Sequence, residues 1–113
     1  MELSFMGYGE KAATFAASNG VTAGTPVKMT ADGTVGPCAA GDLFCGAALN
    51  ERGSYAAVQL AGYVRLPYDG TAPAAGYQTL AAAANGKIGV NAAGRSLLVI
   101  DVDTAAKTCG LIL

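Results

Sequence analysis

The clearest pattern in the chain is the alternation of apolar and polar side chains over residues 55–66. Successive side chains of a β-strand point to opposite faces, so this pattern predicts a strand with one face in the core. The face expected to point inward carries Val58, Leu60, Val64 and Leu66, and the other face carries Gln59, Tyr63 and Arg65. The strand is expected to end at Pro67, because proline cannot donate a hydrogen bond to a neighbouring strand.

Further strands follow from the same reasoning. Over residues 97–103 the expected core face carries Leu98, Ile100 and Val102, while Asp101 and Asp103 form a solvated face. Over residues 108–113 the apolar side is formed by Cys109, Leu111 and Leu113. Weaker strands are predicted at residues 25–30, 34–37, 43–49 and 87–90, with the first two joined as a hairpin around Ala31-Asp32-Gly33.

Turn signals separate these short segments throughout the chain. The dipeptides are Asn19-Gly20, Asp32-Gly33, Asp69-Gly70, Asn85-Gly86 and Ala93-Gly94. Asn-Gly and Asp-Gly favour the positive φ angles of hairpin turns. We therefore predict an all-β fold, a small single-domain β-barrel or β-sandwich with short hairpins and at most one short helical turn.

Two segments are assigned differently. The alanine-rich residues 80–84 are expected to form a short helix or a loop, because alanine favours helix and Asn85-Gly86 follows at once. Residues 1–20 contain few large apolar side chains and are expected to form a flexible N-terminal arm. Residues 21–113 are then the single β domain.

Composition narrows the class of function. Only 13% of the 113 residues are charged, whereas the surface of a soluble domain commonly carries roughly 25–35%. Such a surface suits a chain that packs against neighbouring proteins. The net charge of −1 gives no basic surface for binding nucleic acid. No apolar run approaches the roughly 20 residues that span a bilayer, and the N-terminus lacks a signal-peptide pattern, so we expect synthesis in the cytoplasm and no membrane contact.

Candidate chemistry is sparse. The chain has no histidine, the commonest general base and metal ligand. The spacing of Cys38, Cys45 and Cys109 matches no zinc or redox motif, and these thiols are expected to be small buried apolar groups in a reducing compartment. Val27-Lys28-Met29 resembles the modified lysine motif of biotin- and lipoyl-carrying domains, but the methionine before the lysine is missing. We therefore expect no catalytic residue, no metal, no cofactor and no enzymatic activity.

Tyrosines are the remaining candidates for a functional surface. Tyr55 and Tyr63 lie on the predicted outer face of their strand, and Tyr68 and Tyr77 bracket the loop around Asp69-Gly70. Exposed tyrosines on a surface with little charge are typical of protein interfaces, because each offers a large contact area and a polar tip. The alternative is ordinary cross-strand packing between tyrosines. The candidate interface is therefore Tyr55, Tyr63, Tyr68 and Tyr77.

Three segments give the chain a resemblance to a known family. They are Val-x-x-Gly-x-Pro-Val at residues 21–27, Asp-Leu-Phe-Cys-Gly-Ala-Ala-Leu at 42–49 and Val-Gln-Leu-Ala-Gly-Tyr-Val-Arg-Leu-Pro at 58–67. Together they resemble the capsid decoration, or head-stabilising, proteins of tailed bacteriophages. The resemblance implies a homotrimeric virion protein that binds the major capsid protein on the outside of the expanded head. It also implies an N-terminal arm, here residues 1–20, that orders on binding and pairs with the capsid.

Other functions are compatible with the same residues. One is another phage assembly subunit, in the tail or at the head–tail joint, although no long loop or extended helix for ring contacts is evident. Another is a small ligand-binding or carrier β domain with Lys28 as the modified residue. An enzyme would need acid–base chemistry from carboxylates and tyrosines alone.

Overall fold

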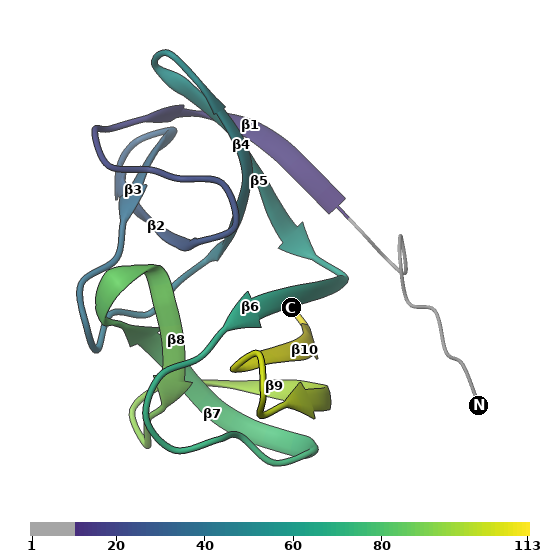
Figure 1. Ribbon diagram of the computed structural model, residues 1–113. Coiled ribbons are helices and arrows are strands. Elements are labelled where there is room, and N and C mark those ends of the chain that lie inside the picture. The colour runs from purple at the N-terminus through teal and green to yellow at the C-terminus, as the bar shows by residue number, and fades with distance from the viewer. Residues whose placement is uncertain (1–10) are drawn as a thin grey trace.

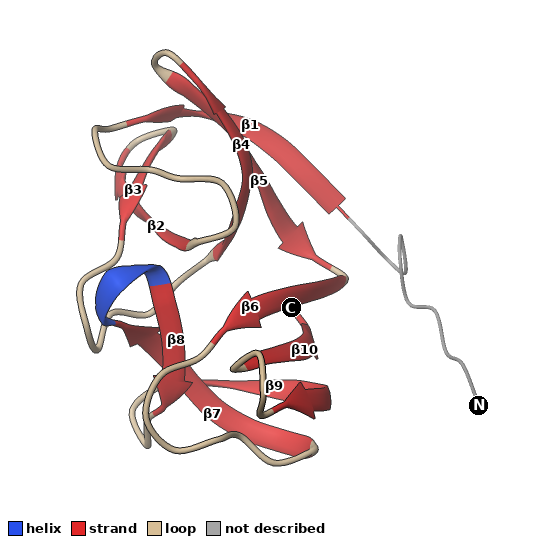
Figure 2. Cartoon of the chain, viewed as in Figure 1, coloured by secondary structure: helices blue, strands red, loops and turns tan. Residues whose placement is uncertain are grey.

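The structure is a computed structural model that describes residues 11–113. It shows a small all-β fold, as predicted, in which a closed five-stranded barrel lies above a second five-stranded sheet (Figure 1). The only helical element among the described residues is a 3-10 turn, Ala84–Gly86, drawn blue in Figure 2.

The barrel is formed by the first half of the chain. Its strands are β1 (Lys11–Ala17), β2 (Pro26–Ala31), β3 (Thr34–Pro37), β4 (Gly46–Arg52) and β5 (Tyr55–Ala61). Their order is β1-β3-β2-β4-β5, and β1 closes the barrel by pairing antiparallel with β5 and parallel with β3. The predicted hairpin around Asp32-Gly33 is confirmed, because β2 and β3 pair antiparallel on either side of it.

The second sheet is formed by the rest of the chain. Its strands are β6 (Tyr63–Pro67), β7 (Gly76–Ala83), β8 (Lys87–Val90), β9 (Arg95–Asp103) and β10 (Thr108–Ile112). Their order is β6-β10-β9-β7-β8, and every pairing between neighbours is antiparallel. The two edge strands of this sheet, β6 and β8, approach one another, and a bridge forms between Tyr68, just after β6, and Ile88 on β8.

A corner at Gly62 connects the barrel to the second sheet. Gly62 has a φ of 92°, a conformation that favours glycine, and it divides the predicted strand over residues 55–66 into β5 and β6. Gln59 is 3% exposed, so its predicted place on the outer face is wrong. Its side-chain Nε2 donates to the carbonyl oxygens of Ala61 at 3.1 Å and Tyr63 at 2.7 Å. The buried amide thus satisfies the backbone on both sides of the corner.

Leu60, predicted to point inward, is 36% exposed. Leu60 forms a β-bulge, because it has no partner in the pairing of β1 with β5, where Lys11 lies opposite Ala61 and Ala12 lies opposite Gln59. Such a bulge reverses the sides to which the following residues point.

The core consists of two clusters, one inside the barrel and one formed mainly by the second sheet together with Phe44 and Ala47. The barrel cluster is Val21, Val27, Val35, Ala48, Ala56 and Val58. The second-sheet cluster is Phe44, Ala47, Leu66, Tyr68, Leu80, Ile88, Leu97, Val99, Cys109 and Leu111. Arg95 helps to join the two parts, because its Nη1 donates to the carbonyl oxygen of Phe44 at 3.0 Å and its guanidinium lies 5.7 Å from the centre of the Phe44 ring.

The predicted core face of residues 97–103 is largely wrong. Leu97 and Val99 are buried, whereas Leu98 and Ile100 are only half-buried. Gly110 pairs with Asp101 and Leu111 with Val99, so Ile100 is the extra residue of a bulge. After this bulge the alternation shifts, and Val102 packs on the core as predicted.

Two further assignments are corrected. Of residues 80–84, expected as a helix or loop, residues 80–83 are part of β7, because their pairing with β8 outweighs the helix preference of alanine. The short helical turn follows at Ala84–Gly86. In the expected arm over residues 1–20, Lys11–Ala17 forms strand β1 of the barrel. Residues 1–10 lie outside the described residues.

Candidate protein interface

The register of the second sheet places four large side chains side by side. Tyr77 on β7 lies opposite Leu98 on β9, Leu98 lies opposite Ile112 on β10, and Ile112 lies opposite Tyr63 on β6. Directly opposite residues on antiparallel strands share a face, with Cβ atoms about 4.5–5.5 Å apart. These residues therefore form one row across four strands, which we call the cross-sheet row.

The cross-sheet row faces away from the core. Leu97 and Leu111, which neighbour row residues in sequence, are buried in the second-sheet cluster, so the row lies on the opposite, outer face. Tyr77 is 73% exposed, the largest exposure among the exposed large hydrophobic residues, and Leu98, Ile112 and Tyr63 are half-buried. The outer face thus presents a strip of aromatic and aliphatic surface.

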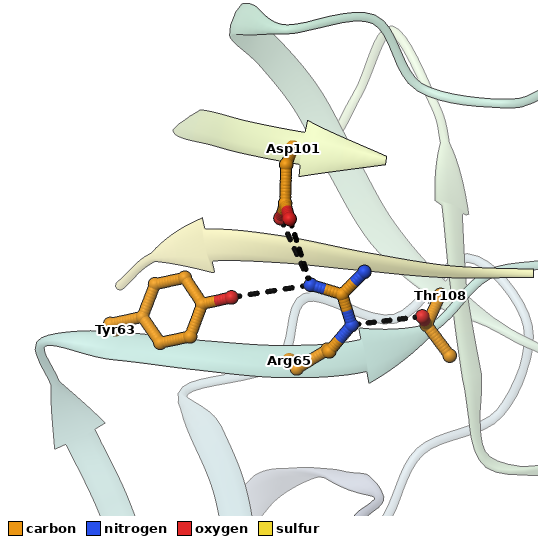
Figure 3. Close-up of polar contacts among 4 residues, drawn as sticks. All are labelled: Tyr63, Arg65, Asp101 and Thr108. Carbon is orange, nitrogen blue, oxygen red and sulfur yellow. Dashed lines mark hydrogen bonds and ion pairs between the residues drawn. The ribbon is translucent and has the colours of Figure 1, made fainter. Parts of the chain in front are cut away.

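An ion pair borders this row. Arg65 on β6 and Asp101 on β9 lie on either side of Gly110 on β10. Because Gly110 has no side chain, Arg65 reaches over β10, and its Nη1 lies 3.0 Å from Asp101 Oδ1 and 3.2 Å from Oδ2 (Figure 3). A Cβ atom at Gly110 would collide with the Tyr63 hydroxyl and the Asp101 carboxylate.

The same arginine also holds Tyr63. Arg65 Nη1 donates to the Tyr63 hydroxyl at 3.3 Å, and Arg65 Nε donates to Thr108 Oγ1 at 3.0 Å (Figure 3). Partial burial acts to lower the pKa of Arg65, but the hydrogen bonds to Tyr63 and Asp101 outweigh it and raise the pKa. Arg65 is therefore charged at every physiological pH and fixes the polar end of Tyr63. A side chain ordered in advance loses less conformational entropy when a partner binds.

The four predicted interface tyrosines have different positions in the structure. Only Tyr63 and Tyr77 are brought together, in the cross-sheet row. Tyr55 is 59% exposed, but it begins β5 beside the β4–β5 turn at the top of Figure 1, in the other sheet. Tyr68 is 3% exposed and belongs to the second-sheet core, so its predicted exposure is wrong.

Sequence reasoning missed Leu98 and Ile112 as parts of this face. Alternation alone assigned Leu98 to the core, and nothing in a single sequence reveals the β6-β10-β9-β7 order that places both residues between two tyrosines.

The three cysteines are free thiols, with Cys109 buried and Cys38 and Cys45 half-buried. Burial raises the pKa of Cys38 and of Cys109 to about 11, and it also raises the pKa of Cys45. Residues 11–113 contain no group of three or more His, Cys, Asp or Glu side chains arranged to hold a metal ion. The thiols are thus placed as apolar packing groups with little thiolate character.

Lys28 lies within β2 and not at the tip of the hairpin. Its Nζ is 2.6 Å from Asp42 Oδ2, and the same oxygen accepts a hydrogen bond from the backbone N–H of Ala39 at 2.8 Å. These two hydrogen bonds lower the pKa of Asp42. A lysine held in this way is not presented for modification as the carrier hypothesis requires.

A hollow of about 300 Å³ lies between the barrel and the 3-10 turn. Its lining residues include Thr22, Thr25, Cys38 and Asn85, and none of the lining residues is charged. The Thr25 hydroxyl donates to the carbonyl oxygen of Thr22 at 2.6 Å. This hollow offers no acid–base pair.

Comparison of the chain with protein-family models gave no match, and comparison with curated proteins gave none either. Among the described residues, no helix has the length and apolar character needed to cross a membrane.

Proposed function

We propose that the chain is a capsid decoration protein of a tailed bacteriophage, which binds the outer surface of the expanded head through the cross-sheet row. In this role it is a structural protein of the virion, made in the host cytoplasm, and its partner is the major capsid protein. It acts as a homotrimer and has no enzymatic, nucleic-acid-binding or membrane function. The resemblance of residues 21–27, 42–49 and 58–67 to this family motivates the proposal.

The observation that carries the proposal is the exposed row of Tyr77, Leu98, Ile112 and Tyr63. Aromatic residues are enriched at protein interfaces, and the centre of an interface is poor in charge. The row has both properties, since its only charged border within the sheet is the Arg65–Asp101 pair, in which each charge is already compensated. The outer face of a sheet suits another protein surface better than a small molecule, which binds in a concave site.

The edge of β1 supports an assembly role independently. β1 pairs with β5 along most of its length, but its pairing with β3 is limited to Ala16 and Ala17. The opposite edge of residues 11–15 therefore has no neighbouring strand among the described residues. An uncovered strand edge can pair with an extended segment of another chain. The strand contains no proline, and Lys11 is its only charged residue, so few side chains oppose the pairing of another strand with this edge.

Co-sedimentation with heads of the parent phage tests the proposal. The purified chain is mixed with expanded and with unexpanded heads, and the bound fraction is measured against concentration. The proposal expects saturable binding to expanded heads alone, near one copy per capsid subunit. Absence of binding to either form would refute it and favour a tail, head–tail joining or carrier role.

A further inference from the structure

A small pit opens on the outer face of the barrel, in the other sheet from the cross-sheet row. It has a volume of about 200 Å³ and is lined by Thr14, Asn50, Arg52, Tyr55 and Ala57, together with Ala56. The register explains the pit: Ala57 lies between Thr14 on β1 and Asn50 on β4, and the next pair along, Tyr55 and Arg52, forms a wall. The small Ala57 side chain is the floor beneath four larger neighbours.

Two side chains of this pit, Asn50 and Arg52, offer hydrogen-bond donors. Asn50 Oδ1 accepts a hydrogen bond from the backbone N–H of Ala57 at 3.3 Å, which leaves the side-chain NH₂ group of Asn50 to donate elsewhere. Arg52 forms no ion pair within residues 11–113, where the cations in ion pairs are Lys28 and Arg65. Glu51 lies opposite Ala56 in the register and so points to the other face of the hairpin.

Tyr55 adds a flat apolar wall to these donors. It is 59% exposed and lies opposite Arg52 on β4 and Ala16 on β1. A ligand for the pit must therefore accept hydrogen bonds, carry negative charge to compensate Arg52, and have a short apolar stem to pack on the tyrosine. A guanidinium pairs with a carboxylate through two parallel hydrogen bonds, so a carboxylate on a short apolar stem matches both Arg52 and Tyr55.

We infer that this pit, which we call the Arg52 pit, binds the carboxylate of an aspartate or glutamate side chain on a partner protein. Its volume is below the roughly 300–1,000 Å³ of sites for drug-sized ligands, so it has room for about one side chain. The Arg52 pit goes beyond the proposed function, because it is a second contact surface on the other sheet and does not depend on the partner being the capsid protein. It identifies partners by an exposed acidic side chain.

Binding to the isolated full chain is measured by NMR. The ¹⁵N-labelled chain is titrated with N-acetyl-glutamic acid methylamide, which carries one free carboxylate, and with the matching glutamine compound as the uncharged control. The expected result is a saturable shift of the Asn50 side-chain NH₂ and Arg52 Nε–H signals. The dissociation constant is expected in the millimolar range, since a single exposed charge contact is weak. The glutamine compound should cause no saturable shift.

Variants separate a specific pit from general charge attraction. Arg52→Gln should weaken binding at least tenfold, while Lys107→Gln, which removes the same charge from an exposed turn, should change it less than twofold. Equal weakening by both variants, or no saturable shift at Asn50 and Arg52, would overturn the inference. Equal or tighter binding of inorganic phosphate would also overturn it, by showing a general oxyanion site. The titration contains no phage heads, so its outcome is independent of the decoration hypothesis.

Discussion

Arg65 on β6 and Asp101 on β9 form an ion pair across an intervening strand, with Arg65 Nη1 3.0 Å from Asp101 Oδ1. The pair exists because the residue between them is Gly110, which leaves room above β10 for the arginine. One glycine thus determines both the charge pairing and the position of the Tyr63 hydroxyl at the border of the cross-sheet row.

The first prediction compares alanine at two glycines. At Gly110 the new methyl group would meet the ends of the Tyr63 and Asp101 side chains, which can move. Loss of the exposed ion pair destabilises the folded chain by about 0.2–1 kcal/mol, whereas replacing a glycine within a strand by alanine stabilises it by roughly 0.5–1 kcal/mol. Gly110→Ala should therefore change the free energy of unfolding by less than about 1 kcal/mol.

Gly46→Ala should lower the free energy of unfolding more than Gly110→Ala does. Its methyl group would collide with the backbone carbonyl oxygen of Gln59, which cannot move without shifting β5. Overpacking of this kind costs typically 1–3 kcal/mol. Urea denaturation followed by circular dichroism measures both variants, and equal stability of the two would contradict the packing described at Gly46.

The second prediction concerns the corner between the two sheets. Gln59→Met keeps the length of the side chain but removes the donor that serves the carbonyl oxygens of Ala61 and Tyr63. Buried acceptors left without a donor cost about 1–3 kcal/mol, so the free energy of unfolding should fall by that amount. The matched control Gln78→Met, whose amide hydrogen bonds are exposed, should change it by no more than about 0.5 kcal/mol. Equal effects of the two variants would show that the corner does not depend on Gln59.

The third prediction is a pH dependence. Lys28 and the Ala39 N–H hold the pKa of Asp42 below its usual 3.8 in the folded chain. As the pH falls below 3.8, the unfolded chain takes up this proton first, so the contribution of Asp42 to stability is complete above 3.8 and is lost as the pH falls through the lower, folded pKa. Urea midpoints from neutral pH to pH 2 should show this loss in the native chain. Asp42→Asn should lack that part of the decline, and identical pH profiles would contradict the assignment.

The fourth prediction concerns the thiols. With a pKa of about 11, Cys38 and Cys109 are ionised to only about one part in a thousand at pH 8, and the thiolate is the reactive form. Iodoacetamide at pH 8 should therefore add no carbamidomethyl group to the folded chain in the time that gives three adducts in urea. Intact mass measures this directly. A rapid adduct at one cysteine in the folded chain would show a reactive thiol that the structure does not predict.

The sequence predicted the fold class but not the face of every strand. The all-β fold followed from turn signals and alternation, and the strand at residues 34–37 and the strand at 87–90 were placed with their observed bounds. Alternation failed at Gln59 and Leu60, and again at Leu98. A bulge or a corner reverses the sides to which residues point, and each of these depends on contacts with strands distant in the sequence.

The candidate interface was predictable only in part. Tyr63 and Tyr77 were identified as exposed tyrosines, but they lie 14 positions apart in the sequence, and their common face depends on β9 and β10 lying between β6 and β7. Tyr68 was misplaced because the chain after Pro67 turns inward to bridge Ile88, which local turn residues do not reveal.

The proposed contact with the expanded head is the cross-sheet row. One pair of variants in the co-sedimentation assay tests this contact most directly. Tyr77→Ser removes the most exposed member of the row, and Leu43→Ser removes an apolar side chain of similar exposure, 56% against 73%, in the loop before β4. We predict that Tyr77→Ser weakens binding to expanded heads at least tenfold, because truncating a tyrosine that is a hot spot of an interface costs about 2 kcal/mol or more. Leu43→Ser should bind as the native chain does. Undiminished binding of Tyr77→Ser, with both variants folded, would contradict the assignment of the row as the capsid contact.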